Sequence, residues 1–432
     1  MDPSTPVSHT INISGISQES FQEESLLSCI ERKLEANCSS FTIYKAPSEI
    51  NIEDRNVFLP AKVSIGPFHH GAPHLESVEK LKWHYLSTFL THKPSLTLQD
   101  LIKLVVKSES RGRKCYEKEF YSSDRDEFSQ IMLLDCCFIL ELLLRYTKRR
   151  FRRPNDPVFT TPGLLYDLRC DLVLLENQIP YFLLEEIYAK VLDGLEENMY
   201  LSDLTSRFFR TMVPGDRKFI GDNFIVEANH LLEMVYSCFL STYPPVETND
   251  KLKSKELPSA SKLKAAGIKF KNARSSKSLL DIKFQNGVLE IPPLRVYQKT
   301  ETILRNLAAY EICQFGTDLQ VKSYLNFMSH LLQSDEDVKI LCRKKILNAL
   351  KDEEEQIIEK LKWIREQKDS LSGTFFAGIV QKLKEKPDRS VARWRRLRSN
   401  STAISVATVL MVVVIFGAAF FAAFSVLQRR YK

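Results

Sequence analysis

The run Ile131–Leu144, IMLLDCCFILELLL, decides the fold of this 432-residue chain. A helix formed by this run would be apolar on nearly every face, and a helix that is apolar all round is buried. Asp135 and Glu141 interrupt the run, and it is shorter than the roughly 20 residues that cross a bilayer. The run therefore predicts a central helix in the core of a globular protein.

Helical periodicity continues on both sides of this run. Apolar residues recur every three or four positions after Leu75, Leu98 and Pro180, which predicts amphipathic helices there. The same pattern predicts helices at residues 164–175, 224–240, 301–313, 320–332, 335–350 and 352–367. Ser20 and Glu23 form a capping box, so one amphipathic helix is expected in the N-terminal segment 1–38. The expected fold class is mainly α.

One β element interrupts the helical pattern. Asn286-Gly287 lies between the runs LLDIKF and VLEIPPLRV, and Asn-Gly between two β-prone runs predicts a hairpin. Proline cannot donate to a strand ladder, so Pro292 and Pro293 are expected to confine the second strand to a sheet edge. We expect a helical domain over residues 39–386 with a small β-hairpin and an internal linker at the Pro-rich, charged stretch 242–258.

The C-terminal run 403–427, AISVATVLMVVVIFGAAFFAAFSVL, has no charged side chain. As a helix it is long enough to cross the bilayer core, which is about 30 Å thick. A basic juxtamembrane segment, 387–402, precedes the run, and the short tail 428–432 follows it. The sequence therefore predicts a single-pass, tail-anchored membrane protein with one C-terminal transmembrane helix.

Basic residues on either side of this run predict its orientation. Eight Lys and Arg residues lie within 382–398, and three follow the run; the more basic side faces the cytosol. No secretory signal is readable at the N-terminus, and nine cysteines without a CxxC pair do not resemble a secreted disulfide framework. We expect the N-terminal region in the cytosol, at the plasma membrane or an endomembrane. The sequons at Asn12, Asn37 and Asn400 leave a lumenal face as the alternative.

The formal net charge of +7 does not indicate a nucleic-acid-binding protein. Residues 382–432 carry a net charge of +9, so residues 1–381 carry −2. A duplex-binding domain keeps its basic excess on the folded part, whereas basic residues beside a span favour an anionic leaflet. The inner basic run Lys148–Arg153 follows a helix end, where it complements the helix dipole, with phosphate or lipid binding as the alternative. The expected partners are the lipid bilayer and an unidentified protein.

Small residues in the apolar run favour weak self-association. Ala418 with Ala422 and Ala419 with Ala423 are pairs four positions apart, and such pairs let two helices approach closely in lipid. They predict a weak homodimer through the span, although a run this rich in alanine also contains such pairs by composition alone.

Three histidines are the metal-binding candidates. His69, His70 and His74 lie around Gly66-Pro67 and Gly71, but a zinc site needs three or four converging ligands. Their spacing is not the i, i+4 pair of the HExxH helix. A turn with hydrogen-bonding imidazoles is the favoured interpretation, and no metal or cofactor is predicted.

Carboxylates in apolar surroundings are the remaining candidates for chemistry. Asp135 and Glu141 are expected to form structural ion pairs, with Arg145 four positions after Glu141. In the stretch Glu176-Asn177-Gln178, the side chains are expected to satisfy backbone groups at a helix break. No P-loop, GxGxxG or G-x-S-x-G motif occurs. We predict no catalytic residue, and hence a protein that is not an enzyme.

Six ordered blocks resemble the signature of a known family. They are VSIGPFHHG at 63–71, LLDCCFILEL at 133–142, LENQIP at 175–180, AGIKF at 266–270, GVLEIP at 287–292 and RNLA at 305–308. In this order, and followed by an apolar span, they are similar to the large plant family of uncharacterised proteins called domain of unknown function 247. The resemblance covers about residues 40 to 430. The segment VARWRRLRSN departs from the family, which has an aromatic and Pro-Trp segment before the span.

The resemblance implies no enzymatic activity. Some grass members of that family are associated with pollen self-incompatibility, which implies recognition or signalling by protein–protein interaction at a plant membrane. The opposing hypothesis is a membrane-tethered enzyme with an unrecognised active site. A deep pocket with one of the three histidines beside Asp135 or Glu176 would favour the enzyme. A closed core in which these groups are paired would favour the binding protein.

Overall fold

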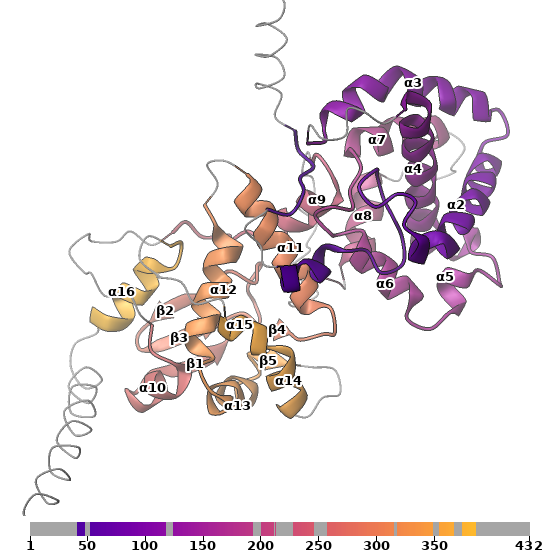
Figure 1. Ribbon diagram of the computed structural model, residues 1–432. Coiled ribbons are helices and arrows are strands. Elements are labelled where there is room, and N and C mark those ends of the chain that lie inside the picture. Colours follow the sequence, from indigo (N-terminus) through magenta and orange to yellow (C-terminus); the bar gives the residue numbers. More distant parts are fainter. Residues whose placement is uncertain are drawn as a thin grey trace, which may run out of the picture.

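The computed structural model places most of the chain between Phe41 and Glu385 (Figure 1). The described residues are 41–47, 52–117, 124–192, 200–210, 212, 228–245, 257–314, 318–348, 354–366 and 374–385. Several expected features lie outside these residues: the N-terminal amphipathic helix, most of the linker 242–258, the juxtamembrane segment, the apolar run 403–427 and the tail.

Within the described residues, no helix is both long enough and apolar enough to cross a membrane.

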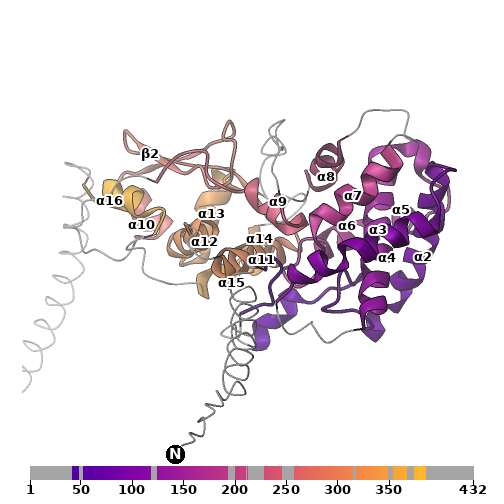
Figure 2. The ribbon, with the colours of Figure 1, turned by 90° about the horizontal axis from the view of Figure 1, so that it is seen from above.

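The first half of the molecule is a group of helices around α4, Arg125–Thr147 (Figures 1 and 2). Every residue of the run 131–144 is buried, which confirms the predicted central helix. Helices α2, α3, α7 and α8 contact α4. The other helices here are α2 Glu76–Phe89, α3 Leu98–Lys114, α5 Pro157–Thr160, α6 Leu164–Asp171, α7 Tyr181–Leu192 and α8 Leu201–Phe209. Short 3₁₀ helices are η1 Ile52–Phe58, η2 Pro73–Leu75, η3 Leu90–His92 and η5 Arg149–Phe151.

Polar side chains fix the ends of these helices. Thr97 and Asp100 form a capping box at the start of α3, which satisfies backbone N–H groups that have no partner inside the helix. At the C-terminal end of α4, Arg152 donates to the carbonyl oxygens of Arg145 and Tyr146 at 3.2 and 3.3 Å. The basic run 148–153 therefore complements the end of the helix, as predicted.

The second half combines helices with two small sheets, and helices α9 and α11 lie between the halves (Figures 1 and 2). The helices are α9 Leu231–Ser237, α10 Ala260–Ala265, α11 Thr300–Cys313, α12 Gln320–Leu331, α13 Asp335–Arg343, α14 Glu354–Lys360, α15 Lys362–Glu366 and α16 Ala377–Glu385. The strands are β1 Lys269–Asn272, β2 Lys283–Gln285, β3 Val288–Ile291, β4 Leu294–Arg295 and β5 Leu347–Asn348. The expected class, mainly α with a small β element, is confirmed.

The predicted hairpin is present, but its second strand is not an edge strand. Strands β2 and β3 pair antiparallel around Asn286 and Gly287, whose φ angles are 51° and 78°. Positive φ at both central residues is what a two-residue turn of this kind requires. Strand β1 then pairs with the other side of β3 in parallel, giving the order β1-β3-β2. The edge prediction was wrong because the pairing uses only residues before Pro292, which ends the strand instead.

Several expected helices are shorter in the structure. The helix expected at 335–350 ends at Arg343, because Lys345 has a φ of 55° and the chain then enters β5, which pairs with β4. The helix expected at 164–175 ends at Asp171. The described residues 354–366 of the region 352–367 form two short helices, and α9 covers 231–237 of the described residues 228–240. A short apolar run after a helix reads the same in a strand or a helix, which explains the missed β5.

Candidate functional site

The backbone of residues 61–66 is held inside the first half by distant side chains. The carboxylate of Asp171, at the end of α6, accepts the N–H groups of residues 61–63 at 2.6 to 3.0 Å. Asn177 accepts the N–H of Ile65 at 2.7 Å and donates to the carbonyl oxygen of Val63 at 3.0 Å. These contacts satisfy buried backbone groups that belong to neither a helix nor a sheet.

Gly66 is the tightest point of this segment. Its N–H donates to Asp135 of α4 at 2.7 Å. Its φ is +74°, and a Cβ placed there would lie 2.4 Å from the carbonyl oxygen of Gln178. No other residue type fits this position without a shift of backbone, since both the conformation and the space require glycine.

Lys82 of α2 carries the charge that balances Asp135. Its Nζ lies 2.5 Å from Asp135 Oδ1 and 2.6 Å from Glu79 Oε1, and it donates to the carbonyl oxygen of Ser64 at 2.5 Å. Lys82 and Asp135 are each 1% exposed. Burial raises the pKa of Asp135, and the neighbouring Lys82 opposes that rise. The predicted ion pair of Asp135 is confirmed, with a partner that the sequence analysis did not identify.

Glu176 and His69 form the half-buried edge of the same segment. Glu176 Oε1 accepts the N–H of Ala46 at 2.8 Å, and Oε2 lies 3.3 Å from His69 Nε2. Burial acts to raise the pKa of Glu176, but the hydrogen bonds from His69 and Ala46 outweigh it and leave the pKa lowered. The pair thus ties the start of the described chain to the turn before α7.

Gln178 completes the turn. Its amide nitrogen donates to the carbonyl oxygens of residues 172 and 174 at 2.9 and 2.8 Å, and its oxygen accepts the N–H of Leu232 at 3.0 Å. Glu176, Asn177 and Gln178 all bind backbone groups, so the prediction for this stretch is confirmed. The same amides end α6 early, because they take the place of helical hydrogen bonds.

The three histidines do not converge. His69 contacts Glu176, His74 Nε2 lies 3.1 Å from the carbonyl oxygen of Pro60, and His70 is exposed. Across the residues that the structure describes, no group of three or more His, Cys, Asp or Glu side chains could hold a metal ion. His74 thus contacts the backbone before the turn, and His69 faces Glu176.

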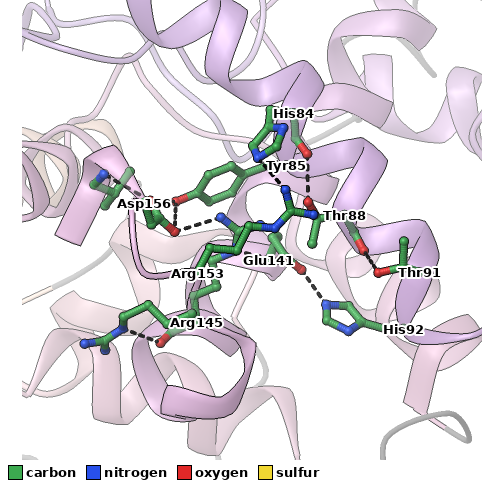
Figure 3. A network of polar contacts seen from close by, with 11 residues as sticks. His84, Tyr85, Thr88, Thr91, His92, Glu141, Arg145, Arg153 and Asp156 are labelled. Atoms are coloured by element: carbon green, nitrogen blue, oxygen red, sulfur yellow. Dashed lines mark hydrogen bonds and ion pairs between the residues drawn. The ribbon is translucent and has the colours of Figure 1, made fainter. Parts of the chain in front are cut away.

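A second polar network lies further along α4, around Glu141 and Arg145 (Figure 3). Arg145 donates through Nε to Glu141 at 2.7 Å and through Nη1 to Asp156 at 2.7 Å. Tyr85 donates to Asp156 at 2.9 Å, and His92 Nε2 lies 2.6 Å from Glu141. Arg145 also lies 4.0 Å above the Tyr85 ring. The predicted Glu141–Arg145 pair is confirmed, but it is one edge of a larger network.

Asn306 of α11 connects these networks to the second half. Its Oδ1 accepts the N–H of Leu175 at 2.7 Å, and its Nδ2 donates to the carbonyl oxygen of Val57 at 2.8 Å. Nearby, Glu311 accepts the Tyr236 hydroxyl at 3.0 Å and two N–H groups at the start of α12 at 2.7 and 2.9 Å. Burial raises the pKa of Glu311 to about 7.

Four of these polar residues were missed in the sequence: Lys82, Asp156, Asp171 and Asn306. For Lys82 a signal was present, because it shares the buried face of α2 with Val78, Tyr85 and Phe89, and a lysine on an apolar face needs a buried partner. Asp171 and Asn306 bind backbone groups more than 100 residues away. Nothing in their local sequence indicates such partners.

These contacts limit what the site can do chemically. Asp135 and Glu141 are 1% and 0% exposed and are paired with Lys82 and Arg145. General acid–base catalysis needs a carboxyl group within hydrogen-bond reach of a substrate proton. Both carboxylates instead hold neighbouring helices and backbone together, which is a structural role.

The chain is therefore a mainly helical protein in which four of the six signature blocks, at 63–71, 133–142, 175–180 and 305–308, are connected by buried hydrogen bonds. A sequence profile of the plant family DUF247, described as plant protein of unknown function, matches residues 43–420, and the chain belongs to this family. It is 30% identical over 340 residues to the UPF0481 protein At3g47200 of Arabidopsis thaliana, which covers 72% of this chain and 69% of that protein. It is 22% identical over 444 residues to the putative UPF0481 protein At3g02645 of the same plant, which covers 79% of this chain and 83% of that protein. No solved structure gives a significant match.

Proposed function

We propose that this protein is a membrane-tethered binding protein without catalytic activity, which presents its helical body to a protein partner. The observation that carries the proposal is the pairing of the candidate groups. Asp135, Glu141, Glu176 and His69 each contact a charged or backbone partner within the fold. Side chains that are paired inside the fold stabilise it. We therefore expect the residues that bind a protein partner on the outer surface.

The proposed membrane tether is argued from the sequence. The run 403–427 is uncharged and long enough to span a bilayer, and the more basic side is N-terminal to it. We therefore place the helical body on the cytosolic face. Pairs such as Ala418 and Ala422 would allow two spans to associate weakly.

Membrane fractionation tests the tether. The full chain should resist carbonate extraction, and a chain that lacks residues 400–432 should become soluble. A truncated chain that still resists extraction would contradict the tether, and a glycan on Asn12 or Asn37 in native membranes would contradict the cytosolic orientation.

A binding experiment tests the recognition role. Proteins labelled by a proximity ligase fused to the N-terminus would be purified and titrated against the purified full chain in nanodiscs. We expect at least one partner to bind saturably with a Kd in the micromolar range or below, and binding to survive Glu176→Gln. Turnover of a small molecule that is lost in Glu176→Gln, without loss of the fold, would contradict the proposal.

A further inference from the structure

Four arginines follow the C-terminal end of α4. Arg149 and Arg150 lie in η5, and Arg152 and Arg153 come directly after Phe151, where η5 ends. Arg149, Arg150 and Arg153 are exposed, and Arg152 is half-buried. Because five successive residues span at most about 14 Å, one short stretch of backbone carries all four positive charges. We call these four residues the arginine patch.

The dipole of α4 accounts for one member of the arginine patch. Arg152 donates to the carbonyl oxygens of Arg145 and Tyr146 at the end of the helix, and its guanidinium lies 4.0 Å from the ring centre of Phe159. A helix C-terminus is equivalent to about half a negative charge, and its effect is confined to the last turn. The patch therefore carries more positive charge than the end of α4 can balance.

Carboxylates of the fold do not balance the remaining charge. Across the part of the chain that the structure describes, three members of the patch have no carboxylate within ion-pair distance, namely Arg149, Arg152 and Arg153. The only acid in residues 148–161 is Asp156. Asp156 is 3% exposed and is already paired with Arg145, so its charge does not reach the surface of the patch.

Arg153 contacts a histidine in place of an acid. Its Nη1 donates to Nε2 of His84 in α2 at 3.1 Å (Figure 3), and His84 is exposed. A guanidinium can only donate, so Nε2 accepts and the imidazole is neutral in this contact. His84 thus supplies a hydrogen bond but no negative charge. The positive charge of Arg153 remains available to an anion outside the protein.

The chemistry of the guanidinium group indicates the class of ligand. Its planar donors match the paired oxygens of a phosphate or a carboxylate. Exposed side chains on an irregular stretch after a helix can follow a surface whose anionic groups move, and they need no fixed recess. A leaflet with anionic headgroups is such a surface, and each basic residue near it strengthens binding about fivefold.

We propose that the arginine patch docks the helical body onto the anionic headgroups of the bilayer that holds the apolar run. The choice of the bilayer rests on the membrane tether and the cytosolic orientation proposed above, because the cytosolic leaflet carries the anionic lipids. Residues 386–402 separate the last described residue from the run, and a chain of that length reaches at most about 60 Å. The tether therefore keeps the leaflet close to the body, whereas a soluble acidic partner has to diffuse to it. Docking fixes which side of the first half faces the bilayer and leaves the other sides to a protein partner.

Capture of anionic vesicles by the tethered chain tests the docking. The full chain is reconstituted in nanodiscs of phosphatidylcholine, and the discs are mixed with phosphatidylcholine vesicles that contain or lack phosphatidylserine. Wild-type discs should float with the vesicles only when phosphatidylserine is present, and about 0.5 M salt should release them, because salt screens exposed charges. Arg149→Gln/Arg153→Gln should weaken the binding about 25-fold, or fivefold for each residue. This pair of substitutions spares Arg152, which binds the end of α4.

The matched control removes the same charge from another surface. Lys262 and Lys264 are exposed on α10 in the second half, so Lys262→Gln/Lys264→Gln should bind the vesicles as the wild type does. Arg149→Lys/Arg153→Lys keeps the charge and should keep most of the binding. A Tm equal to that of the wild type shows that a variant folds. If Arg149→Gln/Arg153→Gln fails this check, Arg149→Gln alone replaces it, with an expected loss of about fivefold.

Several results would overturn the proposal. One is wild-type binding that does not need phosphatidylserine, and another is an equal loss in the lysine control, which indicates general attraction between charges. Release by inorganic phosphate at constant ionic strength would indicate a site for a small anion. Absence of vesicle binding, together with binding of a proximity-labelled protein that is lost in Arg149→Gln/Arg153→Gln, would indicate an acidic protein partner. Co-elution of the chain with the nanodiscs reports the tether separately, so a chain that stays in the discs but does not bind phosphatidylserine refutes the docking and not the tether.

Discussion

Replacing Lys82 by methionine removes one charge from the buried network around Asp135. The Nζ of Lys82 is the only cation in contact with Asp135 among the described residues, at 2.5 Å. Without it, the buried carboxylate, which is 1% exposed, keeps the hydrogen bond from the N–H of Gly66 but has no positive charge beside it. Breaking a buried ion pair by removal of one partner costs about 3–5 kcal/mol. We expect Lys82→Met to lower the free energy of unfolding by that amount.

The double variant Lys82→Met/Asp135→Asn tests the cause of this loss. It has no buried charge at position 135, and the amide oxygen of the asparagine can still accept the N–H of Gly66. Glu79 loses its contact with Lys82 equally in the single and the double variant. We expect it to be at least about 2 kcal/mol more stable than Lys82→Met, because neighbouring groups couple strongly. The control is Lys80→Met on the same helix. Lys80 pairs with Glu76 on the exposed surface, and loss of such a pair costs at most about 1 kcal/mol.

The loss of stability in Lys82→Met should also depend on pH. Burial raises the pKa of Asp135 in the folded protein, and Lys82 opposes that rise, so Lys82→Met raises the pKa further. A carboxyl group with a raised folded pKa takes up a proton on folding, so stability increases as the pH falls through that pKa. The deficit of Lys82→Met should therefore be largest at neutral pH and shrink on acidification.

Denaturant unfolding of the full chain in micelles, followed by tryptophan fluorescence between pH 5 and pH 8, measures these effects. The reasoning is refuted by a cost of Lys82→Met below about 1 kcal/mol, or by a double variant that is as unstable as the single one.

Four further predictions follow from other parts of the molecule. Leu140→Ala should lower the free energy of unfolding by about 2–5 kcal/mol, since Leu140 is fully buried in α4; an unchanged Tm would contradict its place in the core. Gly66→Ala should cost more than about 1 kcal/mol, because its Cβ would meet the carbonyl oxygen of Gln178; equal denaturation midpoints would contradict this. Burial raises the pKa of Glu311 to about 7, so the free energy of unfolding should fall by about 1 kcal/mol from pH 6 to pH 7, and melting curves of Glu311→Gln should lack that dependence. Ala418→Leu/Ala422→Leu should weaken span association in a membrane reporter assay and leave insertion unchanged.

The sequence correctly predicted elements whose structure depends on residues close together in the chain. The all-apolar run 131–144 identified the central helix, because a helix without a polar face has to be buried. Asn286-Gly287 identified the hairpin, because both residues tolerate positive φ. These signals lie within a few residues of the structure that they predict.

The missed features depend on partners far along the chain. Strand β1 pairs with β3 in parallel, and the two-residue strand β5 exists only because β4 is beside it. Asp171 binds backbone groups of residues 61–63, and Asn306 binds Leu175. Such contacts are set by how the halves pack, which periodicity does not report. For the site, the histidine turn and the Glu176–Gln178 stretch were predicted, but the networks that surround them were not.

Several signature blocks form joints of the fold, that is, hydrogen bonds between segments far apart in the chain. This bears on where a functional surface is expected. The block at 63–71 is joined to the block at 133–142 by the Gly66–Asp135 hydrogen bond, and the block at 175–180 is joined to RNLA by the Leu175–Asn306 hydrogen bond. GVLEIP supplies the central strand of the larger sheet. A change at one end of such a joint leaves a buried polar group without its partner at the other end, at a cost of about 1–3 kcal/mol. Residues tied in this way preserve the architecture. What distinguishes one member from another is then expected on surfaces outside the joints, such as the arginine patch after α4.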